Sequence, residues 1–141
     1  TEKHHVEFGH GIYADDISRL TYDKAYELAT ALIKSGKPVI IDASFKRRLE
    51  RRKAVELAEK LGIPFYIVEC TCCDEIVKKR LDKRAGEKNN ASDGRWEIFQ
   101  EQKNDFDEIS EIPADHYFKI DTSENPEITR QEIIRKIKLG Q

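Results

Sequence analysis

The sequence contains no methionine, no long apolar run and no excess of charge of either sign. No stretch of apolar residues approaches the roughly 20 that span a bilayer, so no membrane-spanning helix is expected. The 25 Lys and Arg residues face 27 Asp and Glu residues, a net charge of −2. This balance excludes a protein that coats a polyanion, which would be strongly basic. Because methionine is missing, we expect the native chain to start elsewhere.

Cysteine is scarce and is confined to one short stretch, Cys70, Cys72 and Cys73. An odd number of cysteines without framework spacing favours a reducing compartment, and the cytoplasm is the predicted location. Together with His116 and the N-terminal histidines, these thiols suggest zinc binding. A C-x-C-C stretch without a second paired motif gives that suggestion little weight, and no structural metal is expected.

Helical spacing of apolar residues predicts helices over about 15–35 and over 46–61. Each is followed by a glycine, Gly36 or Gly62, placed where a left-handed residue ends a helix. Further helices are expected from Asp74 and over 96–109. A last helix should open with Asn125 as its N-cap, followed by a proline in the first turn.

Three short runs rich in β-branched and aromatic residues predict buried strands over 39–44, 63–70 and 117–121. They alternate with the helices, which is typical of an α/β layer fold with a parallel sheet and right-handed crossovers. No linker or repeat interrupts the pattern. We therefore predict one α/β domain over residues 1–141, with a polar loop over 85–94.

In an open parallel sheet, ligands bind beyond the carboxyl ends of the strands. The residues at these ends are Asp42, the stretch 70–74 and Asp121. A carboxylate at the position of Asp42 is suited to a magnesium-bound water or to a hydroxyl substrate. It is equally suited to capping the helix that follows, so both interpretations stay open.

A glycine-rich phosphate cradle, G-x-x-x-x-G-K-[ST], is absent from the sequence. The Gly36-Lys37 pair does not supply one, because Pro38 stands at the hydroxyl position and a strand is predicted to follow. Among the basic residues, most are expected to form solvated helix faces. Arg80 and Arg84 share a face and precede the polar loop, so they are the better candidates for contacting a phosphate.

Four segments together resemble the zeta-toxin-like P-loop kinases of the AAA domain type, which are often fused to an aminoglycoside-phosphotransferase-like domain. These segments are Phe8-Gly9-His10-Gly11-Ile12-Tyr13; Val39-Ile40-Ile41-Asp42-Ala43-Ser44-Phe45 with Arg48 and Arg51; Arg80-Leu81-Asp82-Lys83-Arg84 with Ala91-Ser92-Asp93; and Ile120-Asp121-Thr122-Ser123. The resemblance covers residues 8 to 135. It implies an ATP-dependent phosphotransferase that acts on a small-molecule or nucleotide hydroxyl.

The resemblance also implies roles for individual residues. Asp42 would be the catalytic carboxylate and the magnesium ligand, and Arg84 a second catalytic residue under a lid formed by 85–94. The nucleotide would be bound by Arg80, Asp121 and Thr122. The acceptor substrate would be bound by Ser44, Arg48 and Arg51.

The family pattern begins with a strand, a phosphate loop and a helix that this sequence does not contain. We therefore expect an incomplete three-layer sheet, completed by preceding sequence, by another chain or by a rearranged pairing. ATP and Mg²⁺ are implied as cofactors but are not expected to bind well to this chain by itself. The alternative function is a non-catalytic α/β binding module. Partners are expected to be a nucleotide and a small hydroxyl compound, with nucleic acid and membranes disfavoured.

Overall fold

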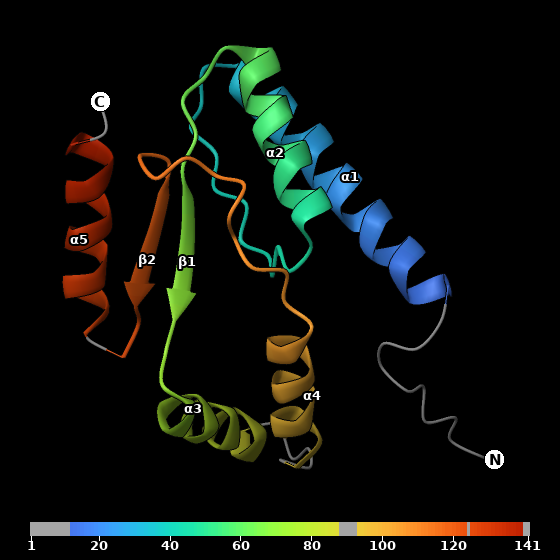
Figure 1. Ribbon diagram of the computed structural model, residues 1–141, viewed down its shortest axis with the longest axis vertical. Helices are drawn as coiled ribbons and strands as arrows, with labels where there is room; N and C mark the ends of the chain where they lie inside the picture. Colours follow the sequence, from blue (N-terminus) through green and yellow to red (C-terminus); the bar gives the residue numbers. More distant parts are fainter. Residues whose placement is uncertain (1–11, 88–92, 124, 140–141) are drawn as a thin grey trace. The chain divides into compact units, whose positions relative to one another are not determined.

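The computed structural model describes residues 12–87, 93–123 and 125–139 (Figure 1). The chain divides into two compact units, Thr1–Phe45 and Lys46–Gln141. The single domain expected over residues 1–141 stays a prediction. Among the helices described, none has the length and apolar character needed to cross a membrane.

The first unit is built on helix α1, Ile12–Lys34, in agreement with the predicted helix over about 15–35. The helix ends as its sequence predicts, because Gly36 adopts a φ of 80°. The Gly36 N–H donates to the Ile33 carbonyl at 2.8 Å, and the Lys37 N–H donates to the Leu32 carbonyl at 3.1 Å. These two bonds satisfy carbonyls that a helix end would otherwise leave unpaired.

The strand predicted over 39–44 is wrong, because residues 37–45 form an irregular segment. Ile40, expected in a buried strand, is 94% exposed. A strand exists only where a neighbour takes its backbone hydrogen bonds, and within the described ranges none pairs with this segment. A β-branched run thus has a high propensity for strand, but it becomes a strand only when a neighbouring strand pairs with it.

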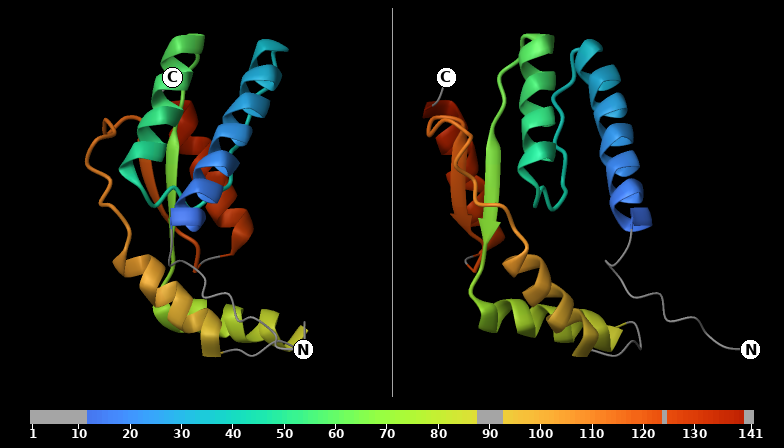
Figure 2. Two further views of the ribbon diagram at one scale, coloured as in Figure 1. Left: turned by 90° about the vertical axis from the view of Figure 1, so that its right-hand side faces the viewer. Right: turned by 45° about the vertical axis from the view of Figure 1, so that its right-hand side comes forward.

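The second unit begins with α2, Arg48–Leu61, which confirms the helix predicted over 46–61. Gly62 closes it in the left-handed conformation, with a φ of 65°. Strand β1, Ile67–Thr71, then pairs in parallel with β2, Tyr117–Asp121. The register places Thr71 opposite Asp121, so both strands end at the same edge (Figure 2). The structure thus confirms a small parallel α/β arrangement, with two of the three predicted strands present in the described part of the chain.

Helices α3, Asp74–Glu87, and α4, Asp93–Asn104, lie between the two strands in the sequence and contact each other. Helix α4 stops before the predicted end at 109, because residues 105–111 turn to contact the start of α2. The polar loop expected over 85–94 is shorter than predicted, since its two ends belong to α3 and α4. Its middle, 88–92, lies outside the described residues.

Helix α5, Pro126–Leu139, packs against β2 and covers the face that carries Phe118 and Ile120. Ile120 is fully buried, and the Phe118 ring stacks on Tyr66 with centroids 5.4 Å apart. The predicted N-cap is confirmed, because the Asn125 Oδ1 accepts the Glu127 N–H at 2.9 Å. This small core fixes the strand ends from which the candidate site is built.

Candidate functional site

The carboxyl edge of the parallel pair carries a guanidinium bound to a strand end. Arg80, on α3, donates through Nη2 to the Thr122 carbonyl at 2.6 Å. Thr122 is itself fixed to the neighbouring strand, because its N–H and its hydroxyl both donate to the Thr71 carbonyl, at 2.7 and 2.9 Å. The edge therefore holds an arginine on a rigid turn that both strands define.

The turn after β2 is organised around the Asp121 carboxylate. Its Oδ1 accepts the Ser123 N–H at 2.8 Å. Hydrogen bonding from Ser123, through both hydroxyl and backbone, and the nearby Arg80 charge lower the pKa of Asp121 below its ordinary value. Asp121 is exposed and so stays ionised next to the guanidinium.

Three predicted nucleotide-binding residues, Arg80, Asp121 and Thr122, thus come together at one edge. Arg84 lies one turn further along α3, is exposed, and has no polar partner among the residues that the structure describes. Within the described part of the chain, Arg84 is able to reach a ligand without first breaking a polar contact. Its role in catalysis stays a prediction.

Asp42 and Ser44 lie in the other unit, on the irregular segment that follows α1. Both are exposed. Tyr22 holds this segment, because its hydroxyl oxygen accepts the Phe45 N–H at 2.8 Å and lies 3.4 Å from the Ser44 Oγ. Phe45 has a φ of 43°, unusual for a residue with a side chain, and its ring lies 5.1 Å from that of Tyr22.

Arg51, predicted to bind the acceptor substrate, is fully buried. Its Nε lies 2.6 Å from Glu111, and its Nη2 donates to the Asp107 carbonyl at 3.0 Å. Arg48 is exposed and contacts the same loop, since its N–H donates to the Asp107 carboxylate at 2.9 Å and its Nη2 to Ser110 at 3.2 Å. In this arrangement Arg51 holds the 105–111 loop in place. To bind an acceptor substrate, Arg51 would first have to break its contact with Glu111.

The acidic partners of these arginines carry no signal in the sequence pattern. Asp105 and Asp107 stand two residues apart in a segment predicted to be helical, and Asp105 pairs with both Lys46 and Arg47 at 2.9 and 2.7 Å. Contacts between residues nearly 60 positions apart leave no periodic signal. The only available signal was the opposite charge of the two segments.

The turn after β2 does not supply a phosphate cradle. A phosphate cradle needs several unengaged backbone N–H groups, and those of Thr122 and Ser123 are already donated within the turn. No described part of the chain brings three or more metal-ligating side chains together. Asp42 alone offers a magnesium ion one carboxylate, which suffices only when phosphate oxygens supply further ligands.

Comparison with protein families identifies the chain. The family model described as an AAA domain matches residues 3–109, well over half of the 141 residues. No curated protein and no solved structure matches the chain. The match includes α1, α2, β1, α3 and α4 and ends before β2. The chain therefore belongs to the AAA domain family, a group of P-loop NTPase-like proteins with kinase-like character.

Proposed function

We propose that this chain is part of an ATP-dependent phosphotransferase that acts on a small-molecule or nucleotide hydroxyl and resembles the zeta-toxin-like kinases. The observation that carries the proposal is the Arg80–Thr122 contact at the carboxyl edge of a parallel strand pair, in a chain that matches the AAA domain family. Ligands of parallel α/β folds bind at this edge.

In this proposal Arg80, Asp121 and Thr122 border the nucleotide, and Arg84 lies over its phosphates. A guanidinium suits the latter place because it forms strong, charge-assisted hydrogen bonds with phosphate oxygens. Asp42, Ser44 and Arg48 would serve the acceptor side and the metal. The cytoplasm is the proposed location, supported by three cysteines that form no disulfide.

The phosphate cradle itself is proposed to come from residues outside the printed sequence. Support comes from the missing glycine-rich motif and from the engaged N–H groups of the turn. Titration calorimetry with Mg-ATP should therefore detect no micromolar binding to the 141-residue chain, while the protein as its gene encodes it should bind. Micromolar binding by the 141 residues alone would contradict this part of the proposal.

The second candidate function is a non-catalytic module that binds a partner or a small anion. The engaged turn amides favour it, because a small anion at this edge would then be bound by cationic side chains such as Arg80 and not by a backbone cradle. The gene sequence separates the two candidates. A phosphate-loop motif encoded shortly before Thr1 supports the kinase, and its absence from the encoded protein supports the module.

A further inference from the structure

The acidic segment 105–111 has no part in the proposed function, yet it contacts the start of α2 in two places that differ in burial. The first place is the Arg51 side chain, which is fully buried, as is most of Glu111, 13% exposed. Arg51 also donates to the Asp107 and Glu108 carbonyls, at 3.0 and 3.3 Å. This buried contact is the anchor of the segment.

The second place is exposed and carries ion pairs. The Asp105 carboxylate lies 2.9 Å from the Lys46 Nζ and 2.7 Å from the Arg47 Nη2. The Asp107 carboxylate lies 3.5 Å from the Arg47 Nη1. The four side chains are between 37% and 47% exposed, so solvent reaches each of these charges. Together they form the latch.

The latch also completes the start of α2. The first N–H groups of a helix have no partner within it, and Arg47, the N-cap, forms no side-chain cap. The Arg48 N–H donates instead to the Asp107 carboxylate at 2.9 Å. A negative charge is favoured there, because this end of a helix is positive. The first turn of α2 therefore depends on a carboxylate 59 positions further along the chain.

The cations of the latch offset an unfavourable position of Asp105. This residue directly follows α4, and the carbonyl end of a helix disfavours a negative charge. Hydrogen bonds from Lys46 and Arg47 lower the pKa of Asp105 below its ordinary value. The Asp105 carboxylate is therefore held by charges that solvent reaches.

We propose that the latch opens as the salt concentration rises and releases the first turn of α2, while the anchor stays closed. Salt shortens the distance over which exposed charges act, from about 10 Å at 0.1 M to about 3 Å at 1 M, and affects buried pairs much less. The inference does not depend on the proposed function, because every contact lies within the second unit. Arg48, which the proposed function places on the acceptor side, lies in the turn that the latch holds.

Hydrogen exchange of backbone amides, measured by NMR at about 0.05 M and about 1 M NaCl, tests the latch. Each rate is divided by that of an unstructured peptide of the same sequence at the same salt concentration. The Arg48 amide should exchange at least about threefold faster at the higher concentration. The Glu127 amide is the matched control, since it also lies at a helix start but is held by the neutral Asn125 side chain, and its rate should stay constant. An unchanged Arg48 rate, or equal acceleration of both amides, would overturn the proposal.

The Arg51 Nε–H reports on the anchor in the same experiment, because it donates to Glu111. Its exchange should be equally slow at both salt concentrations. Acceleration that matches that of the Arg48 amide would show that the segment leaves α2 as a whole, which contradicts the division into latch and anchor.

Asp105→Asn opens the latch without salt, because it removes the carboxylate that both cations contact. At the lower salt concentration the Arg48 amide should exchange at least about threefold faster than in the parent, and added salt should change its rate little. Asp115→Asn is the matched control, since it removes an exposed carboxylate that pairs with His116, and it should leave the rate unchanged. Equal rates in Asp105→Asn and the parent, or equal acceleration by both substitutions, would contradict the latch. Urea unfolding midpoints establish that each variant is folded, and the salt response of the parent decides the proposal by itself should either unfold.

Discussion

The Arg51 guanidinium, fully buried, lies 2.6 Å from the Glu111 carboxylate and so ties α2 to the loop that follows α4. Phe106 lies beneath the same guanidinium, with its ring centroid 5.4 Å from the Arg51 Cζ. A buried charge is tolerated only when it is paired and hydrogen-bonded, and Arg51 has both kinds of partner. This contact anchors the 105–111 loop.

Replacing Arg51 by Met should destabilise the protein by about 3–5 kcal/mol, because the largely buried Glu111 then keeps only the exposed Arg48, 3.6 Å away, as a cationic partner. Urea unfolding measures the effect. Arg52→Met is the matched control, since Arg52 is 63% exposed and lies 3.7 Å from Glu56. The control should change the free energy of unfolding by less than about 0.5 kcal/mol. Equal effects of the two substitutions would contradict the buried pairing.

Stability should fall in acid through Glu111. Burial raises the pKa of Glu111. Hydrogen bonds from Arg51 and from the backbone lower this pKa by more than burial raises it, so the pKa of Glu111 lies below the ordinary 4.5. A lowered pKa in the folded state means that Glu111 contributes stability above its unfolded pKa. This contribution is lost as the pH falls through the folded pKa.

The measurement is the free energy of unfolding between about pH 6 and about pH 3, in the parent protein and in Glu111→Gln. The Gln variant should be less stable at the upper end and should lose less stability in acid. Glu56→Gln, which removes an exposed carboxylate, should leave the parent's acid dependence intact. An unchanged dependence in Glu111→Gln would show that other groups cause it.

Tyr22→Phe should loosen the segment that carries Ser44. The substitution keeps the ring that packs on Phe45 and removes the oxygen that accepts the Phe45 N–H. The loss of one such hydrogen bond costs about 1 kcal/mol. Hydrogen exchange at the Phe45 amide should accelerate, whereas exchange in the middle of α1 should not. A protected Phe45 amide in the variant would contradict this contact.

An effect at the start of α5 is expected from Asn125→Ala, which removes the acceptor of the Glu127 N–H. Loss of an N-cap costs about 1 kcal/mol, measured by urea unfolding. Asn125→Asp is the control, because a carboxylate oxygen caps equally well and should preserve stability. Equal destabilisation by Ala and Asp would mean that the amide acts in another way.

Arg84→Ala tests the proposed catalytic residue in the protein as its gene encodes it. ATP consumption with a panel of hydroxyl acceptors should fall at least about tenfold, with Mg-ATP affinity changed far less. Lys83→Ala, a neighbouring exposed cation, should leave turnover unaffected. Unchanged turnover in Arg84→Ala would remove Arg84 from the mechanism.

Most of the helices were predicted correctly, because the spacing of apolar residues, the stop glycines and the caps that define a helix all lie within one short stretch of sequence. The helix stops at Gly36 and Gly62 and the cap at Asn125 are each decided by the conformation or the side chain of one residue. The strand at 117–121 was predicted with its observed bounds. Its neighbour began later than predicted, at Ile67, after Pro64 and an irregular approach.

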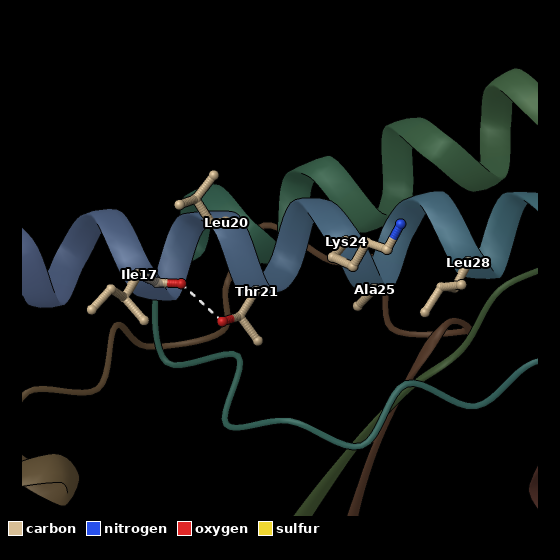
Figure 3. Close-up of a pocket in the computed structure, with 6 residues that line it drawn as sticks. All are labelled: Ile17, Leu20, Thr21, Lys24, Ala25 and Leu28. Atoms are coloured by element: carbon tan, nitrogen blue, oxygen red, sulfur yellow. Dashed lines mark hydrogen bonds between the residues drawn. The ribbon is translucent and has the colours of Figure 1, made fainter.

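The apolar face of α1 shows where local signals stop being sufficient. Ile17, Leu20 and Leu28 lie on helical spacing, as predicted, yet they are 65%, 64% and 55% exposed. With Thr21, Lys24 and Ala25 they line a shallow hollow on the surface of this one helix (Figure 3). Periodicity identifies the face of a helix that is suited to burial, but it does not supply what covers that face.

The sequence by itself determined most of the helices, two strands and their parallel pairing, and it placed Asp121 at a strand end, because strand ends in a parallel sheet lie at one edge. The grouping of Arg80 with Asp121 and Thr122 was expected only from the family resemblance. Only the tertiary structure decided that residues 39–44 form no strand and that Arg51 is buried against Glu111. Both depend on partners distant in the sequence. A backbone forms a strand, and a charge is buried, only where such a partner completes its hydrogen bonds.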